Sequence, residues 1–169
     1  GHAILQAADW INSEHVAVLF GDDIFSGEHS GIAQLMAAHD ALTSDDQGAI
    51  LALEKLEDSK ISQKGIVEVG SIHATIERLQ SIKSLVEKPN LEDAPSNLGI
   101  VGRYIVPRST IDLLPSVGAS HGGEIRLIDA LIEQLGSIPI HGLECTGIRL
   151  DTGTPEGYAR AVQVLTADL

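Results

Sequence analysis

The positions of hydrophobic residues along the first third of the chain predict an alternation of helices and strands. Residues 2–12 and residues 30–42 carry apolar side chains at three- and four-residue spacing, which is typical of helices with one buried face. Residues 16–20 and residues 49–53 are short runs that are apolar throughout, as expected of strands covered on both faces. The order helix, strand, helix, strand predicts crossover connections and a mainly parallel sheet, with residues 16–20 as a central strand.

The middle of the chain has a different pattern, which predicts a β-rich insertion between about residues 60 and 106. Short strands are expected at residues 65–69, 72–79 and 82–86. The dipeptides Gly70-Ser71 and Gln80-Ser81 predict hairpin turns between them. A long strand at residues 97–106 then contains Gly99 and Gly102, and a glycine inside a strand marks either a bulge or a close approach of a ligand to the backbone.

The last third of the chain returns to helices and strands in alternation. Ser109 predicts the start of a helix that runs to Leu114, and a longer helix is expected from about residue 123 to residue 135. Strands follow at residues 138–143 and 147–150, and Pro155 suits the first turn of a final helix. The pattern contains no repeat and no linker, so we expect a single α/β domain over residues 1–169 with helices on both faces of a mixed sheet.

Three polar patches each follow directly after an apolar strand. They are Gly21-Asp22-Asp23, Glu87-Lys88-Pro89 and Asp151-Thr152-Gly153. The carboxyl ends of the strands are the edge at which open α/β sheets bind ligands. If Asp22 and Asp151 meet at this edge, they form a two-carboxylate site for Mg²⁺, with Lys88 near a phosphate that the metal also contacts. Taken singly, each patch is also typical of an ordinary turn, a helix cap or a solvated strand end.

The charge and the cysteine content restrict the possible partners and the cell compartment. The net charge of -13 argues against binding to nucleic acid or to an anionic membrane, because such surfaces need clustered Lys and Arg. No apolar run is long enough for a membrane span, and no signal segment opens the chain. The single cysteine, Cys145, cannot form an internal disulfide, which predicts a cytoplasmic protein.

Eight short motifs in a fixed order resemble the bacterial UTP–glucose-1-phosphate uridylyltransferases, which are sugar-nucleotide pyrophosphorylases. The motifs are GHAIL (residues 1–5), AVLFGDD (17–23), GIVE (65–68), LVEKP (85–89), APSNL (94–98), VGRYI (101–105), GGEI (122–125) and DTG (151–153). Each motif is weak alone, but together they cover nearly the whole chain.

The resemblance implies a Rossmann-like nucleotidyltransferase fold and the conversion of UTP and glucose 1-phosphate into UDP-glucose and pyrophosphate. By motif position, it implies that Asp22 and Asp151 hold Mg²⁺, that Glu87 and the backbone at Gly65 bind the glucose, and that Lys88 binds its phosphate. Lys88 and Asp22 would therefore be the catalytic residues. Such a transfer depends mainly on the alignment of the two substrates and on neutralisation of their charge.

The resemblance also implies a nucleotide side, but the sequence departs from the family there, and the sheet edge that this departure leaves uncovered predicts a homo-oligomer. Gly1 and His2 match the stretch that lies beside the nucleotide. Arg126 and Ile128 stand where the family has Gln and Thr, which puts the fine specificity in doubt. The family's glycine-rich loop, which cradles the triphosphate, is absent. We therefore expect the carboxyl-terminal part of such an enzyme, with little activity alone and a tendency to self-associate through an uncovered sheet edge.

Two other functions remain open from the sequence. A thymidylyltransferase would act on the same sugar phosphate, although residues 94–97 and 102–104 favour the uridylyl family. A non-catalytic domain that binds sugar phosphates would fit the missing phosphate loop, but it would not need Asp22, Asp151 and Lys88 together.

Overall fold

The computed structural model describes residues 1–118 and 123–167. The helices are α1 (His2–Leu5), α2 (Gly31–Ala41), α3 (Asp58–Ile61), α4 (Arg108–Leu113), α5 (Leu127–Gln134) and α6 (Pro155–Leu165), with 3₁₀ turns at Ala8–Trp10 and Leu91–Asp93. The strands are β1 (His15–Leu19), β2 (Asp23–Ser26), β3 (Ala49–Lys55), β4 (Gly65–Ile72), β5 (Leu79–Glu87), β6 (Leu98–Pro107), β7 (Ile140–Glu144) and β8 (Ile148–Asp151).

Six of the strands form one mixed sheet in the order β1-β6-β3-β7-β5-β4. The expected α/β class is confirmed, but the expectation of a mainly parallel sheet is wrong. In the described part of the chain β3 and β7 are parallel, whereas β6 runs antiparallel to β1, β3 and β4. The hairpin β4–β5 adds two more antiparallel neighbours. The strands from residues 60–106 therefore belong to the main sheet, and each of its described antiparallel pairs includes one of them.

The strand expected at the centre of the sheet lies at its edge. β1 pairs with β6 alone, and Val18 is buried whereas Leu19 is 50% exposed. The true centre is β3, in which all residues from Ala49 to Leu53 are buried. Both runs are apolar throughout, and only the pairing with distant strands decides which of them is covered on both faces.

The middle of the chain forms one long hairpin in place of the expected three short strands. β4 continues through the expected turn at Gly70-Ser71, and β5 contains the expected turn at Gln80-Ser81. The reversal occurs at residues 73–78, where the Nδ1 atom of His73 accepts hydrogen bonds from the backbone N–H groups of Thr75 and Ile76. The turn is therefore stabilised by a histidine side chain that accepts backbone hydrogen bonds, and not by the glycine from which a turn was predicted.

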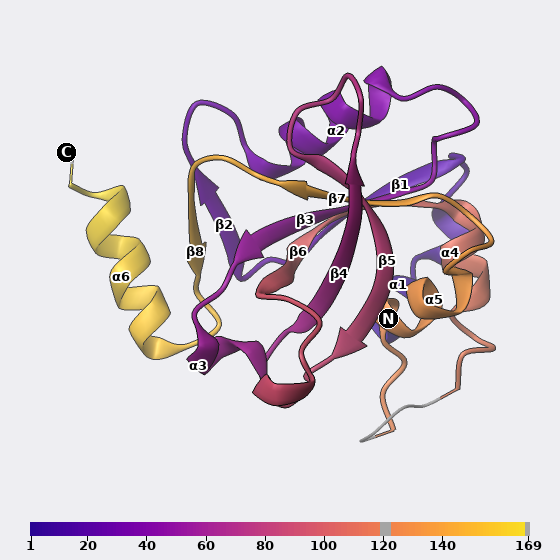
Figure 1. The fold of residues 1–169 in the computed structure, drawn as a ribbon. Helices are drawn as coiled ribbons and strands as arrows, with labels where there is room; N and C mark the ends of the chain where they lie inside the picture. Colours follow the sequence, from indigo (N-terminus) through magenta and orange to yellow (C-terminus); the bar gives the residue numbers. More distant parts are fainter. Residues whose placement is uncertain (119–122, 168–169) are drawn as a thin grey trace.

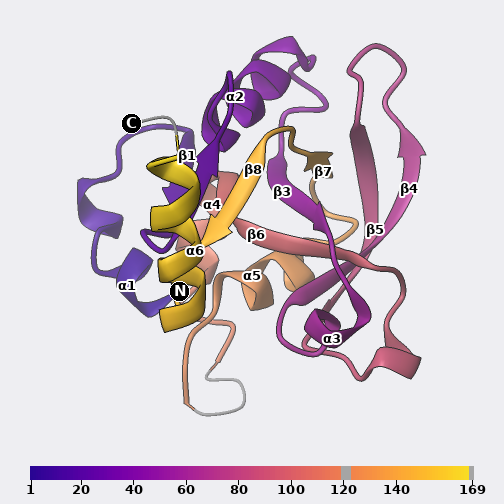
Figure 2. The ribbon, with the colours of Figure 1, turned by 90° about the vertical axis from the view of Figure 1, so that its left-hand side faces the viewer.

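Helices cover both faces of the sheet, as expected (Figures 1 and 2). Side chains of α2, such as Leu35, pack against Ile50 and Ala52 of β3 on one face. On the other face, Leu51 of β3 joins the buried residues of α4 and α5. This alternation along β3 follows from the two-residue period of a strand. None of the described helices is long and apolar enough to cross a membrane.

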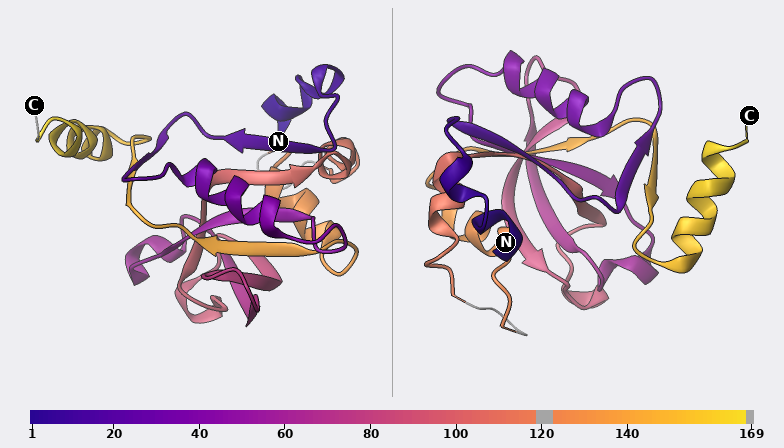
Figure 3. Two further views of the ribbon diagram at one scale, coloured as in Figure 1. Left: turned by 90° about the horizontal axis from the view of Figure 1, so that it is seen from above. Right: turned by 180° about the vertical axis from the view of Figure 1, so that it is seen from behind.

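The two-stranded ribbon β2–β8 and the carboxyl-terminal helix α6 lie to one side of the main sheet (Figure 3). Asp23 pairs with Asp151 in the antiparallel ribbon, and Thr152 donates its backbone N–H to the carbonyl oxygen of Asp22. α6 begins as expected, with Pro155 in its first turn and the Thr154 hydroxyl accepting the N–H of Gly157. By contrast, α4 begins after Pro107, and Ser109 does not cap it.

Acidification is expected to destabilise the fold through its buried histidines. His141 on β7 is 7% exposed, and burial lowers the pKa of its imidazole. The pKa of His15 is lowered as well, by burial and by the neighbouring His39. Because an unfolded histidine binds a proton near pH 6.5, the unfolded state takes up protons that the folded state does not, so stability falls as the pH drops below this value. Urea unfolding at pH 7.5 and 5.5 measures the effect. His141→Gln should reduce the pH slope, whereas the same change at the exposed His29 should leave it unaltered.

Candidate functional site

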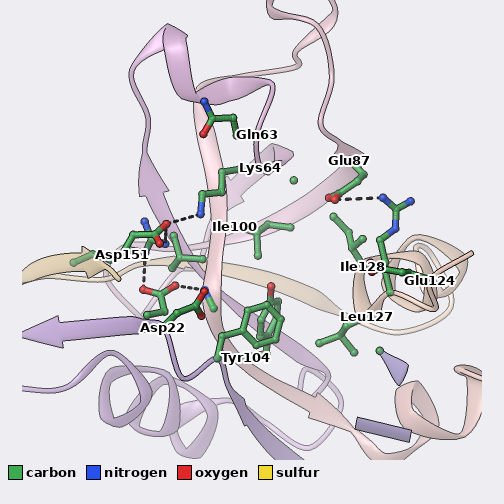
Figure 4. Close-up of a pocket in the computed structure, with 18 of the residues that line it drawn as sticks. Asp22, Gln63, Lys64, Glu87, Ile100, Tyr104, Glu124, Leu127, Ile128 and Asp151 are labelled. Carbon is green, nitrogen blue, oxygen red and sulfur yellow. Dashed lines mark hydrogen bonds and ion pairs between the residues drawn. The ribbon is translucent and has the colours of Figure 1, made fainter. Parts of the chain in front are cut away.

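A cavity of about 260 Å³ lies between the ribbon β2–β8, the β4–β5 hairpin and the segment before α5 (Figure 4). The predicted site residues Asp22, Asp151, Gly65, Glu87, Gly102 and Gly1 all line it. Asp22 and Asp151 lie together on one side, and Glu87 lies across the cavity from them (Figure 4). The structure therefore brings together residues that are up to 150 positions apart along the chain.

The two adjacent aspartates after β1 have different environments. Asp22 is exposed, and its carboxylate carries no hydrogen bond or ion pair within residues 1–118 and 123–167. Asp23 is 3% exposed; its Oδ2 accepts the backbone N–H of Gly102 at 2.6 Å, and its Oδ1 accepts Nε of Arg149 at 2.7 Å. Asp22 is thus available to a ligand, whereas Asp23 is part of the framework.

Arg149 connects the carboxylates beneath the cavity. Its guanidinium donates to Asp23, to Glu54 at 2.9 Å and to Asp151 at 3.1 Å, and its side chain is only 9% exposed. Burial opposes the positive charge, but the hydrogen bond and the charge of Asp23, together with the charges of Glu54 and Asp151, outweigh it and raise the pKa of Arg149. The arginine therefore remains charged and fixes the three carboxylates in place.

Lys64 contacts the same carboxylate oxygen of Asp151 as Arg149 does. Its Nζ lies 2.8 Å from Oδ2 of Asp151, and Gly153 donates its backbone N–H to Oδ1 at 3.1 Å. The hydrogen bond from Lys64 is the main cause that lowers the pKa of Asp151 to about 2, against the effect of burial. Asp151 is therefore ionised throughout the physiological range.

The opposite side of the cavity carries a carboxylate above an apolar floor. A Cβ atom on Gly65 would lie 2.5 Å from Cδ1 of Ile128 and 3.1 Å from Oε2 of Glu87, so a larger residue here would displace Ile128 and crowd Glu87. Arg126 contacts Oε1 of Glu87 at 3.4 Å. Tyr104 completes the floor of the cavity and is 8% exposed. Its burial, together with the charges of Glu87 and Asp23, raises the pKa of the phenol, so the hydroxyl keeps its proton.

The two glycines that the sequence suggested as cavity-lining residues have different surroundings. A Cβ on Gly102 would lie 2.7 Å from Cβ of Phe20 and 2.9 Å from Oδ2 of Asp23, and Gly102 lines the cavity. A Cβ on Gly99 would lie 2.3 Å from Cδ1 of Leu56, away from the cavity. Gly99 therefore permits close packing inside the fold and does not line the site.

Two of the predicted site residues do not line the cavity. Lys88 follows the last residue of β5; its side chain is 58% exposed, and its Nζ lies 3.9 Å from Oε1 of Glu87. Its φ of 48° is a left-handed conformation that non-glycine residues seldom adopt. His2 is exposed and donates its backbone N–H to the carbonyl oxygen of Ile125. Gly122 of the expected GGEI motif lies outside the described residues.

The sequence reasoning missed Lys64, Tyr104 and Arg149 as cavity residues. A signal existed for two of them. Lys64 directly precedes Gly65 in the sequence. Arg149 lies two residues before Asp151 on the same strand, so the side chains of Arg149 and Asp151 point to the same face. Tyr104 carried no such signal, because its position depends on the pairing of β6 with β1 and β3.

The donor set at Asp22 and Asp151 is chemically suited to a divalent cation. Oδ2 of Asp22 and Oδ1 of Asp151 lie 3.0 and 3.2 Å from the point that a Cβ on Gly153 would occupy, so the two carboxylates face the same space. Four carboxylates, those of Asp22, Asp23, Glu54 and Asp151, surround two cations, Lys64 and Arg149, which leaves a net charge of -2. No group of three or more His, Cys, Asp or Glu suited to a metal occurs in the described ranges. Mg²⁺ commonly binds through one or two carboxylates and completes its shell with water and phosphate oxygens.

Comparisons with known proteins identify the family of the chain. The nucleotidyl transferase family profile matches residues 1–168. The UTP–glucose-1-phosphate uridylyltransferase YngB of Bacillus subtilis (strain 168) is 34% identical over 161 residues, which are 95% of this chain and 52% of that protein. The uridylyltransferase of Komagataeibacter xylinus is 33% identical over 154 residues, 90% of this chain and 51% of that protein.

The fold comparison gives the same result. The crystal structure of a UDP-glucose pyrophosphorylase complexed with UDP-glucose superposes with a TM-score of 0.88 and 32% identity, covering 99% of this chain and 62% of that one. The resemblance that the eight motifs indicate is therefore confirmed in sequence and in fold. The chain spans about half the length of the curated relatives that it matches.

Proposed function

The chain belongs to the nucleotidyl transferase family, and on this premise we propose that it serves uridylyl transfer from UTP to glucose 1-phosphate. The observation that carries the proposal is the pair of adjacent carboxylates, Asp22 and Asp151, facing Glu87 across one cavity. The curated relatives are named for the same reaction, which supports it.

In this reaction, a phosphate oxygen of glucose 1-phosphate attacks the α-phosphorus of UTP. The bond from that phosphorus to the oxygen that bridges to the β-phosphate breaks, and pyrophosphate leaves with the bonding electrons. The attacking oxygen is already ionised, so the protein needs no general base. Its task is to hold the two substrates in line and to offset their negative charge.

The chain's own residues are proposed to bind the sugar and to position the phosphates. Glu87 accepts hydrogen bonds from glucose hydroxyls, and the backbone at Gly65 and Gly102 allows the ring to approach closely. Gly1 and His2 are assigned to the nucleotide side. Asp22 and Asp151 would hold Mg²⁺, which when bound neutralises charge on the phosphates.

Lys88 is proposed to contact the phosphate of the sugar. Its ammonium group lies at the rim, 3.9 Å from Oε1 of Glu87, and is exposed enough to move toward an anion. Its left-handed backbone at φ 48° supports this role, because such conformations are concentrated at functional sites. Lys64 is already engaged by Asp151, whereas the ammonium of Lys88 contacts only Glu87 in the described part of the chain, which supports its assignment to the phosphate.

Binding of glucose 1-phosphate and of UDP-glucose to the purified chain, with Mg²⁺ and with EDTA, tests the proposal. We expect Mg²⁺-dependent binding that Glu87→Gln weakens about tenfold or more, because a hydrogen bond to a charged acceptor contributes about 1.5–3 kcal/mol. Glu92→Gln, at an exposed position in the Leu91–Asp93 turn, is the matched control and should bind as the wild type does. Isothermal titration calorimetry gives the affinities.

Absence of binding would contradict the proposal. If neither glucose 1-phosphate nor UDP-glucose binds under either condition, the proposal is wrong. Competition between UTP and TTP separates uridylyl from thymidylyl transfer. Binding without release of pyrophosphate fits both a non-catalytic binding domain and the low activity expected of this part of the enzyme alone. A cytoplasmic location and a homo-oligomer, expected from the sequence, stay predictions.

A further inference from the structure

The two carboxylate oxygens of Glu87 have different surroundings. Oε1 lies 3.4 Å from Nη1 of Arg126 and 3.9 Å from Nζ of Lys88. Oε2 has no hydrogen bond or ion pair in the described part of the chain, and it lies 3.1 Å from the point that a Cβ on Gly65 would occupy. One oxygen is therefore held by cations, and the other faces the space left by the missing side chain of Gly65.

Arg126 is itself held in place. Its Nε and Nη2 donate to the two carboxylate oxygens of Asp129 at 3.1 and 3.2 Å. Arg126 is the residue immediately before α5, and the buried Leu127 and Leu131 fix that helix to the core. The side chain of Arg126 is only 25% exposed. The planar guanidinium thus has one edge on Asp129, which leaves Nη1 to donate to Glu87.

We propose that Arg126 is a positioning residue that fixes the orientation of Glu87, so that Oε2 accepts a hydroxyl group of the sugar ring. This inference rests on the proposed function. By holding Oε1, Arg126 removes the rotational freedom that the carboxylate would otherwise lose when the sugar binds. The site can then select a sugar by one hydroxyl group, which donates a hydrogen bond to Oε2. An analogue that lacks this hydroxyl leaves Oε2 without a partner.

The inference predicts that Arg126 controls discrimination between sugars and has little influence on nucleotide affinity. A lysine at this position offers one compact charge that cannot contact Asp129 in a bidentate manner and reach Glu87 as well. Arg126→Lys should therefore keep part of the effect, and Arg126→Met should lose it. Arg160→Met, on the exposed face of α6, is the matched control.

The experiment measures the affinity of the full chain with Mg²⁺ for glucose 1-phosphate, for its 2-, 3-, 4- and 6-deoxy analogues and for UTP. Arg126→Met should weaken glucose 1-phosphate about tenfold and leave UTP unchanged, since a charge-assisted hydrogen bond loses its fixed geometry. The preference of the wild type for glucose 1-phosphate over the analogue that lacks the recognised hydroxyl should fall to the level seen with Glu87→Gln. The double variant should bind no more weakly than Glu87→Gln alone, because both changes act on one interaction.

Unchanged sugar discrimination in Arg126→Met, or losses that add in the double variant, would overturn the inference while leaving the proposed function intact. A wild-type chain that does not bind glucose 1-phosphate would contradict the proposed function, and the inference with it. If Arg126→Met does not fold, Asp129→Asn loosens the same arginine and should reduce the discrimination in the same direction. A fall in Tm without any change in discrimination would show a structural role only and would also overturn the inference.

Discussion

Asp22→Asn is expected to abolish the Mg²⁺-dependent part of ligand binding while leaving the fold intact. The carboxylate of Asp22 has no protein partner within the described ranges, so its replacement breaks no internal contact. It removes one of the two charges that face the space beside Gly153. Since even residues that only orient a metal ligand change metal affinity by about 10–100-fold, we expect a loss of about 100-fold in Mg²⁺ affinity, with little change in Tm.

Titration of Mg²⁺ in the presence of UDP-glucose, or of Mn²⁺ followed by electron paramagnetic resonance, measures this loss. Asp45→Asn, in an exposed loop, is the matched control. Asp151→Asn should lose metal binding as well, but it also removes the partner of Lys64 and Arg149 and is therefore expected to lower the Tm. An Asp22→Asn chain with wild-type Mg²⁺ affinity would exclude Asp22 as a ligand.

Among the substitutions proposed here, Arg149→Met is expected to lower the free energy of unfolding the most. The arginine side chain is 9% exposed and its partner Asp23 is 5% exposed, so the substitution leaves an ionised carboxylate buried without its counter-ion. Breaking a buried pair in this way costs about 3–5 kcal/mol. That is a large part of the roughly 5–15 kcal/mol by which a domain is stable. Urea unfolding at pH 7 measures the difference in the free energy of unfolding.

The double variant Asp23→Asn/Arg149→Met tests the cause. An asparagine at position 23 carries no charge, and its side-chain oxygen can still accept the N–H of Gly102, so we expect part of the lost stability to return. Arg160→Met is the control for removal of an exposed arginine and should leave the free energy of unfolding close to that of the wild type. If Arg149→Met were as stable as the wild type, the ionic network beneath the cavity would not be holding the ribbon to the sheet.

The two networks have separate roles although they share the cavity. Arg149 and Lys64 hold the carboxylates of the ribbon β2–β8, whereas Arg126 holds Glu87 on the opposite side. The first network lies next to Asp22, whose carboxylate has no partner in the described residues, and the second holds Oε1 of Glu87 and leaves Oε2 unpaired.

Local sequence determined most of the helices and several of the strands of this protein. The helical spacing of residues 30–42 gives α2, and the apolar run at residues 49–53 gives β3, because each pattern fixes a buried face independently of distant residues. The motifs also identified the family, and they named both acids that face Gly153.

Long-range pairing decided the rest. β1 and β3 have equally apolar sequences, yet one is an edge strand and the other the centre, since burial depends on which strands pair beside them. Asp22 and Asp23 are neighbours of one chemical type, yet only the placement of Gly102 and Arg149 makes one a framework residue and leaves the other free for a ligand. Residue type and spacing set what a side chain can do. The three-dimensional neighbours, which no local pattern contains, determine which of those possibilities is used.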